Sequence, residues 1–183
     1  RLPRMMFDFI EGGTGREMAA QTNRAALDGL KLQSRALVNV EQLETVTAFL
    51  GTDYGLPFGI APMGMCNLIS PNADLALSRQ ARTRNIPHCV STAASTTLED
   101  TFVESGGNAW FQLYAGSDAD VTFEMVDRAQ AAGYQHLVFT VDTPRHSRRA
   151  RDLSNGFAVP LKIGPKQFID FALHLQWSIS RCI

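Results

Sequence analysis

A carboxyl group stands where a predicted buried strand ends. Residues 137–141 are apolar except for Thr140, which is typical of a strand covered on both faces, and Asp142 follows before Pro144 ends the strand. Three earlier apolar runs also end in polar or glycine-containing segments. The candidates at the four ends are Ala61, Pro62, Met63, Ser91, Gln112, Tyr114, Thr140 and Asp142. Parallel α/β sheets bind ligands at the carboxyl ends of their strands, so these residues predict a site for a flat, hydrogen-bonding ligand.

Each candidate also has a purely structural interpretation. Asp142 can cap the turn that follows it, the hydroxyls of Ser91 and Thr140 can be satisfied inside a core, and Tyr114 can keep its phenol in water. Gln112 lies in an apolar strand, where an amide without partners costs on the order of 1 to 3 kcal/mol, and we expect a ligand to satisfy it. The shared direction of the polar ends favours a site. It is not a glycine-rich phosphate loop, because the sequence has no Gly-x-Gly-x-x-Gly or Walker pattern.

Strand and helix alternate between residues 56 and 143. The predicted strands are 57–62, 88–92, 109–114 and 137–141, and the predicted helices are 70–85, 96–106 and 118–133. Thr96 with Glu99 marks one helix start and Asp118 or Ser117 marks another, while Gly106 and Gly133 mark helix ends. This alternation indicates right-handed parallel crossover units and therefore an α/β fold. Whether the sheet is doubly wound or part of a closed barrel stays open at this point.

The flanking segments have a different texture. Before the alternation we expect helices at 3–10 and 14–30, the second with a capping box of Thr14 and Glu17, and extended chain at 32–40 and 44–50. After Pro144 we expect a polar loop over 145–155, irregular chain over 157–165 and a short apolar helix over 168–175. This last helix either packs on its own domain or contacts a membrane surface.

Composition narrows the class of protein. The 183 residues are 45% hydrophobic and 19% charged, which suits one globular domain, and a net charge of −1 gives no footprint for nucleic acid. The local basic run over 145–166 is a solvated loop, or it faces an anionic substrate or a membrane. Cys66, Cys89 and Cys182 are odd in number and far apart, so we expect no disulfide framework, no metal site and a reducing, cytoplasmic compartment. The sequence contains no run of about 18 apolar residues, so we expect no membrane-spanning helix in it.

Longer motifs add a resemblance. They are Ile60-Ala61-Pro62-Met63-Gly64, Phe111-Gln112-Leu113-Tyr114, Leu137 to Pro144, Arg148-Arg149, and Arg151-Asp152-Leu153-x-Asn155-Gly156-Phe157. Together they resemble the FMN-dependent 2-hydroxy acid oxidase and dehydrogenase family, which includes glycolate oxidase, lactate oxidase and dehydrogenase, and mandelate dehydrogenase. The likeness runs from Leu2-Pro3 to the helix near Trp177. It implies the N-terminal half, about four βα units, of a (β/α)8 TIM barrel in one incomplete domain, with a lead-in at 1–55, the strands and helices at 56–143 and a loop and helix at 144–183.

The resemblance also implies a function and residue roles. It implies FMN at the C-terminal mouth of the barrel and oxidation of a small L-2-hydroxy acid to the 2-oxo acid, with oxygen, a quinone or a cytochrome as electron acceptor. Ala61, Pro62 and Met63 would contact the flavin, and Ser91, Gln112 and Thr140 would hydrogen-bond its ring. Tyr114 would touch the substrate, Asp142 would pair with the catalytic histidine, and Arg149 would lie at the edge of the active site. The complete protein would be a homo-oligomer, cytoplasmic or held peripherally on the inner membrane.

Two departures qualify the resemblance. Phe9 replaces a tyrosine that binds the substrate carboxylate in many members of the family. The flavin-contacting lysine, the histidine base, the substrate-binding arginine and the phosphate-holding segments of the second half are also missing; His88, His136, His146 and His174 lie where they cannot replace the base. The chain would then be a truncated, inactive part of the enzyme. The alternatives are a non-catalytic degenerate half-barrel or binding fragment and, from strand rhythm alone, a phosphate-binding aldolase or isomerase barrel.

Overall fold

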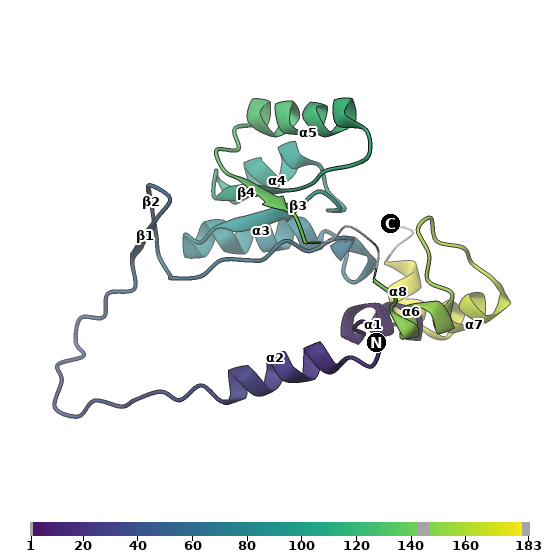
Figure 1. The fold of residues 1–183 in the computed structure, drawn as a ribbon, viewed down its shortest axis with the longest axis horizontal. Helices are drawn as coiled ribbons and strands as arrows, with labels where there is room; N and C mark the ends of the chain where they lie inside the picture. The colour runs from purple at the N-terminus through teal and green to yellow at the C-terminus, as the bar shows by residue number, and fades with distance from the viewer. Residues whose placement is uncertain (1, 143–146, 181–183) are drawn as a thin grey trace. The chain divides into compact units, whose positions relative to one another are not determined.

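A computed structural model describes residues 2–142 and 147–180 (Figure 1). Contacts divide the chain into two compact units, residues 40–144, here called the sheet unit, and residues 1–39 with 145–183, the helical unit. The sheet unit contains β1 (Thr47–Phe49), β2 (Thr52–Tyr54), the 3-10 helix η1 (Cys66–Leu68), α3 (Ala73–Arg84), β3 (His88–Ser91), α4 (Leu98–Ser105), β4 (Ala109–Tyr114), α5 (Ala119–Ala132) and β5 (Leu137–Thr140). The helical unit contains α1 (Arg4–Glu11), α2 (Met18–Asp28), α6 (Ala150–Asn155), α7 (Pro165–Leu173) and α8 (Leu175–Ile179).

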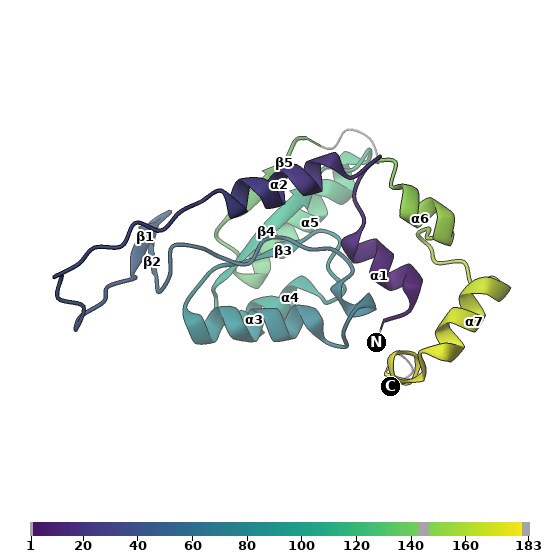
Figure 2. The same cartoon turned by 90° about the horizontal axis from the view of Figure 1, so that it is seen from below.

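Three parallel strands form the main sheet, in the order β3-β4-β5 (Figure 2). Figure 1 shows α4 and α5 on one side of β3 and β4. The core on that side consists of Val90, Leu98, Ala109, Phe111, Leu113, Ala129 and Tyr134. Val90, Phe111 and Leu113 are alternate strand residues, which is why their side chains share one face of the sheet. The predicted α/β fold with parallel strands is confirmed, and within the described residues it is a partial, open barrel with β5 at its edge.

The first predicted strand, residues 57–62, makes one parallel bridge, between Ile60 and His88. The Ile60 carbonyl oxygen also accepts the N–H of Cys89 at 2.9 Å. Prolines stand at positions 57 and 62 and have no N–H to donate to a longer ladder. The segment therefore lies beside β3 as extended chain, and the ladder has three strands where four were predicted.

Capping residues set the helix ends of the sheet unit. The Asp118 carboxylate accepts two N–H groups of the first turn of α5, at 2.9 and 3.4 Å, and Gly133 ends the helix with a φ of 106°. Both assignments confirm the sequence prediction. The N-cap of α4 lies one residue later than predicted, at Thr97 rather than Thr96, and its Oγ1 accepts the N–H of Asp100 at 3.1 Å.

The helical unit departs from the sequence prediction at its second helix. Glu17 does not form a capping box with Thr14; its carboxylate accepts the N–H of Gly13 at 3.3 Å and binds Arg151 Nη2 at 2.5 Å. Helix α2 consequently begins after Glu17, at Met18. The extended chain expected over 32–40 contains no strand among the described residues.

The polar loop predicted over 145–155 also contains a helix, α6. Its charges find partners that sequence spacing does not reveal. Arg149 Nε lies 3.2 Å from Asp152 Oδ2 one turn along α6, and Asn155 Nδ2 donates to Asp8 Oδ2 of α1 at 2.7 Å. These contacts stabilise helical chain in a segment whose composition is typical of a loop. The residues of this prediction at 145 and 146, like Pro144, lie outside the described residues.

Candidate functional site

Three side chains at the carboxyl end of the sheet form a hydrogen-bonded row, here called the polar row. Ser91 Oγ donates to Gln112 Oε1 at 3.0 Å, and Gln112 Nε2 donates to Thr140 Oγ1 at 2.9 Å. The row lies on the face opposite the helical core, because alternate residues of a strand point to opposite faces. Ser91 and Gln112 are buried, with the glutamine 2% exposed. Gln112 thus finds the partners that its burial requires on β3 and β5, and its contact with a ligand stays a prediction.

The polar row keeps capacity for a ligand. A glutamine amide has two donor and two acceptor positions, and the bonds to Ser91 and Thr140 use one of each. Thr140 accepts from Gln112, so its own hydroxyl hydrogen can still be donated, and this side chain is half-buried. A planar ring whose edge alternates donors and acceptors can thus bond to the same row without breaking it.

Two loops border the polar row. The loop after β3 folds back so that the N–H of Ala93 donates to Ser91 Oγ at 3.1 Å. The loop after the extended segment 57–62 joins it, because the N–H of Met65 donates to the Ala93 carbonyl oxygen at 2.8 Å. The predicted flavin-contacting residues at the junction of that segment and the second loop are exposed: Ala61, Pro62 and Met63.

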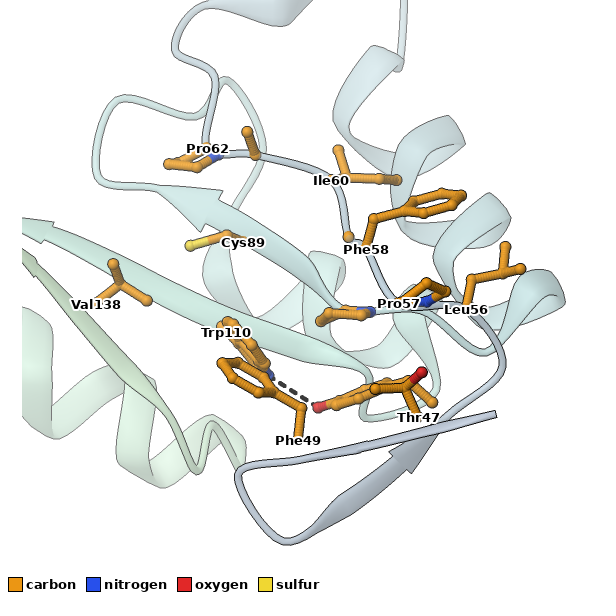
Figure 3. A pocket seen from close by; sticks show the side chains of 14 residues that line it. Thr47, Phe49, Leu56, Pro57, Phe58, Ile60, Pro62, Cys89, Trp110 and Val138 are labelled. Carbon is orange, nitrogen blue, oxygen red and sulfur yellow. Dashed lines mark hydrogen bonds between the residues drawn. The ribbon is translucent and has the colours of Figure 1, made fainter. Parts of the chain in front are cut away.

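An apolar pocket of about 410 Å³ lies against the sheet (Figure 3). It shares a face with the polar row, because the strand residues that line it alternate with residues of the opposite face. The sheet contributes Cys89, Trp110 and Val138, each two residues before a member of the polar row. The rest of the lining comes from Thr47, Phe49, Tyr54, Leu56, Pro57, Phe58, Gly59, Ile60, Ala61, Pro62 and Pro87. Trp110 Nε1 donates to the Tyr54 hydroxyl at 3.0 Å, which fixes the indole against the β1–β2 hairpin. The face of the sheet opposite the helical core, here called the inner face, therefore changes from apolar to polar toward the carboxyl ends of the strands.

Tyr114 and Asp142 stand beyond the polar row. Tyr114 ends β4 and is 44% exposed, and its N–H donates to Thr92 Oγ1 at 3.0 Å. Thr92 Oγ1 in turn donates to the Gln112 carbonyl oxygen at 2.7 Å. Sequence reasoning gave Thr92 no role, although its place in the same polar segment as Ser91 was a signal. Asp142 is exposed two residues after Thr140, and the turn it was alternatively expected to cap lies outside the described residues.

Arg149 belongs to the helical unit and has partners within it. Its Nη2 donates to the carbonyl oxygens of Phe9 and Gly12 at the end of α1, the second at 2.6 Å. The guanidinium also lies over the Phe9 ring, with its central carbon 5.1 Å from the ring centroid, and that ring stacks on Phe157 at 4.6 Å. These contacts give Arg149 a structural role, because it caps the carbonyl oxygens at the C-terminal end of α1. Its place at the edge of an active site stays a prediction.

The described histidines have structural partners. His88 Nδ1 lies 3.0 Å from Ser78 Oγ, and burial lowers the pKa of His88 more than the nearby Asp74 charge raises it. His136 packs edge-on against Trp110, and His174 Nδ1 lies 2.7 Å from the Asp170 carbonyl oxygen. His146 lies outside the described residues. The three described histidines thus agree with the structural interpretation.

Other reactive chemistry finds little support in the described part of the chain. Burial raises the pKa of the Cys66 and Cys89 thiols to about 11, so both thiols are protonated at neutral pH and are poor nucleophiles. Within residues 2–142 and 147–180, no group of three or more histidine, cysteine or acidic side chains is arranged to hold a metal ion. The helices of the same residues are all too short or too polar to cross a membrane.

Comparison with known proteins gives this geometry a family. The model of the FMN-dependent dehydrogenase family matches residues 1–182. The chain belongs to this family. This membership excludes the alternative of an aldolase or isomerase barrel, which the alternation of strands and helices alone had suggested.

Individual relatives agree with the family match. The 4-hydroxymandelate oxidase of Amycolatopsis orientalis is 38% identical over 159 residues, which are 87% of this chain and 44% of the relative. The (S)-mandelate dehydrogenase of Pseudomonas putida is 35% identical over 179 residues, 98% of this chain and 45% of the relative. A crystal structure described as the monotopic membrane protein (S)-mandelate dehydrogenase superposes with a TM-score of 0.91 at 34% identity, covering 98% of this chain and 48% of the other. The chain thus spans about half the length of the relatives it matches.

The residues present fit the cofactor of this family. The ring system of FMN is planar, and its edge carries both donors and acceptors, which is what the unused positions of the polar row can bond. The sheet unit therefore brings together six predicted flavin contacts and two predicted substrate-side residues on adjoining strand ends and loops. They are Ala61, Pro62, Met63, Ser91, Gln112, Thr140, Tyr114 and Asp142.

Proposed function

We propose that this chain forms the amino-terminal part of an enzyme that uses FMN to oxidise a small L-2-hydroxy acid to the 2-oxo acid. The observation that carries the proposal is the polar row at the carboxyl ends of three parallel strands, in a chain of the FMN-dependent dehydrogenase family. Relatives named for mandelate, lactate and glycolate support a 2-hydroxy acid as the substrate class. When bound, FMN supplies the acceptor for the two electrons that leave the substrate.

The residues of this chain then bind the cofactor and orient the substrate. Ser91, Gln112 and Thr140 hold the edge of the flavin ring by hydrogen bonds, while the loop at 61–63 packs against it. The half-exposed Tyr114 donates its phenol hydrogen to the substrate carboxylate. Asp142 accepts a hydrogen bond from a histidine of the remaining part of the protein and stabilises that imidazole once it has taken the substrate proton. Arg149 adds positive charge at the edge of the site.

The visible spectrum of the complete protein tests the proposal. We expect the purified protein to show flavin absorption that bleaches under anaerobic conditions when L-lactate, glycolate or L-mandelate is added. The substrate that bleaches it fastest identifies the physiological class, and re-oxidation by oxygen, a quinone or a cytochrome identifies the acceptor. A complete protein without flavin absorption would refute the proposal.

Gln112 gives a sharper test of the flavin site. Gln112→Leu removes the centre of the polar row, so we expect FMN to dissociate about 10-fold more readily or more. Ser105→Ala is the matched control, because Ser105 is equally buried but bonds the Phe102 carbonyl oxygen on the helix side of the sheet. If both variants lower thermal stability but neither changes FMN affinity, Gln112 has no cofactor role.

The exposed edge of the sheet favours a second candidate, a non-catalytic half-barrel. Leu137 is 50% exposed, Phe139 is 55% exposed and Val141 is 79% exposed, which is unusual for a parallel sheet. On this view the 183 residues fold alone and bind at most a partner. Turnover of a 2-hydroxy acid by the 183-residue chain would exclude this candidate. If only a longer protein turns the substrate over, the function of the gene product is still catalytic, whether or not the half-barrel folds alone.

We propose further that the protein contacts a membrane surface peripherally, from the cytoplasmic side. The support is an exposed apolar series in the helical unit: Val159, Ile163, Phe168, Ile169, Leu173, Leu175 and Ile179. Lys162 and Lys166 lie within the same stretch and can meet anionic lipid headgroups. One solved relative is described as a monotopic membrane protein, which agrees with this proposal.

A further inference from the structure

Asp74 is a buried carboxyl group that the proposed reaction does not use. It lies in the first turn of α3 and is 2% exposed. Aspartate is seldom buried so completely unless its oxygens are satisfied, because desolvation of a carboxyl group is costly. Asp74 Oδ2 accepts the backbone N–H of Ser95 at 2.8 Å. The carboxyl group therefore holds the loop that follows β3.

A second loop contacts the same turn of α3. The Cys66 thiol of that loop donates to the Met63 carbonyl oxygen at 3.7 Å, and burial together with the nearby Asp74 charge raises the pKa of this thiol to about 11. The neighbouring Asn67 connects the same parts of the chain, since its N–H donates to Ser95 Oγ at 3.2 Å and its Oδ1 accepts the N–H of Ala73 at 2.9 Å. The first turn of α3 thus contacts both the loop at 63–68 and the loop at 92–95.

The two loops are also in direct contact with each other. The N–H of Met65 donates to the Ala93 carbonyl oxygen at 2.8 Å, and a Cβ added to Gly64 would lie 3.0 Å from the Ala93 Cβ. Ala93 also connects these loops to the polar row, because its N–H donates to Ser91 Oγ at 3.1 Å. Ser91 Oγ then donates to Gln112. A continuous series of contacts joins Asp74 to the polar row, and Met63 lies two residues before the joined segment.

On the basis of the proposed function, we propose that Asp74 is a positioning residue of the flavin site, which holds the loops at 63–68 and 92–95 in place for the cofactor. Among the described residues, the Asp74 carboxylate hydrogen-bonds to Ser95 and to no member of the polar row. It fixes the backbone that carries Met63 and the N–H that sets the Ser91 hydroxyl. Its loss therefore affects cofactor affinity through the loops and not through a direct contact.

Ser78 provides a matched control. It lies one turn further along α3 and is also fully buried, at 0% exposure. Its Oγ pairs with His88 Nδ1 at 3.0 Å, at the amino end of β3 and away from both loops. Ser78→Ala therefore removes a buried polar contact of the same helix without touching the proposed loop anchor.

The experiment compares Asp74→Asn, Asp74→Glu and Ser78→Ala in the complete protein. Amide hydrogen exchange of residues 63–68 and 92–95 is measured in the flavin-free form, FMN affinity is measured by fluorescence titration, and thermal stability is measured alongside. We expect Asp74→Asn to exchange these amides about 10-fold faster and to bind FMN about 10-fold more weakly, because an amide oxygen is a weaker acceptor than a carboxylate; this factor corresponds to about 1.4 kcal/mol. Asp74→Glu keeps the carboxyl group and should recover most of both losses. Ser78→Ala should lower thermal stability and leave loop exchange and FMN affinity within about 2-fold of wild type.

Each result decides a different part. Unchanged loop exchange in Asp74→Asn would overturn the anchoring role whether or not flavin binds. Faster exchange with unchanged FMN affinity would overturn the link from the loops to the cofactor. A wild-type complete protein that binds no FMN would refute the proposed function instead, and the exchange data on the flavin-free protein would still decide whether Asp74 anchors the loops.

Discussion

Asp142 lies outside the strands that carry Ser91, Gln112 and Thr140. It is exposed two residues beyond the last residue of β5, whereas Ser91 and Gln112 are buried within their strands. An exposed carboxylate contributes little to the stability of the fold, so its substitution tests chemistry with little interference from unfolding.

Asp142→Asn in the complete protein should therefore separate catalysis from folding. We expect kcat to fall on the order of 10² or more, because the amide no longer stabilises a protonated histidine, while FMN content and melting temperature stay unchanged. The measurements are steady-state kinetics, the flavin-to-protein ratio and a thermal melt. Wild-type kcat in this variant would return Asp142 to the role of a turn cap.

Tyr134 gives a prediction for pH. Its hydroxyl donates to the Leu98 carbonyl oxygen at 2.9 Å and pairs with Thr101 Oγ1 at 2.9 Å, and burial raises its pKa from 10.0 to about 12. The folded state holds the phenol proton more tightly than the unfolded state, so the free energy of unfolding falls as pH rises from about 10 to about 12. We expect a loss of roughly 1 to 2 kcal/mol across this window.

Tyr134→Phe isolates that effect. Thr101 Oγ1 keeps its bonds to the carbonyl oxygens of Thr97 and Leu98, so the variant should still fold. Urea unfolding at several pH values should show a shallower decline above pH about 10 than in wild type. The Cys66 and Cys89 thiols, whose pKa burial raises from 9.0 to about 11, lower stability in the same direction and serve as the shared background. Parallel curves for both proteins would contradict the prediction.

Single residues were predictable from the sequence where strand direction alone decides. The polar ends of the runs at 88–92, 109–114 and 137–141 predicted that Ser91, Gln112 and Thr140 belong together, and the structure places them in one row. Their bonds to one another were not predictable, because these depend on strand order and register, which are long-range properties. The same reason hid the role of Asp74, whose partner Ser95 lies 21 residues away, beyond β3.

At the scale of elements, the C-terminal helices present an unusual surface for a chain with no spanning helix among its described residues. In α7, Phe168 is 67% exposed, Ile169 is 60% exposed and Leu173 is 77% exposed. These positions are spaced as one side of a helix requires, with Lys166 close by in sequence. The pattern suits a helix that lies in the interface of a membrane.

Substitution on this helix tests the membrane proposal. We expect the complete protein to sediment with vesicles that contain anionic lipid, and the double variant Ile169→Glu/Leu173→Glu to lose most of that binding, because charge opposes burial among acyl chains. Leu27→Glu, on the exposed part of α2, is a control with similar exposure, at 68%. Equal sedimentation of all three proteins would contradict a role for α7.

Helix ends were predictable where a single local contact sets them. Asp118 and Gly133 act locally, through bonds to residues within four positions, so their sequence signals translate directly into structure. The prediction of a strand at 57–62 was wrong because its prolines have no N–H to donate to a neighbouring strand. The sequence alone does not show which of these N–H groups the ladder would need. Helix α6 was missed because its polar residues Arg151 and Asn155 are satisfied by Glu17 and by Asp8 of α1, more than 130 positions away in sequence.

At the scale of the whole molecule, the sheet unit has a covered side and an uncovered side. Helices α4 and α5 cover one face of the strands, while the other face carries the apolar pocket and the polar row. The relatives of the family are about twice as long as this chain. We propose that the further sequence of the complete protein covers the inner face and pairs with β5, which would close the barrel that the family fold implies.

The isolated 183-residue chain should therefore associate with itself. A parallel strand at an edge offers unpaired backbone groups, and β5 adds exposed apolar side chains at Leu137 and Phe139. Light scattering on samples from about 1 to 100 μM should show mass rising with concentration. Phe139→Lys should suppress the association, since a charge on an edge strand opposes pairing. Phe7→Lys, 50% exposed on α1, should leave it unchanged. A monomer across the whole range would mean that the uncovered edge of β5 is tolerated in water, and that nothing further is needed to complete this fold.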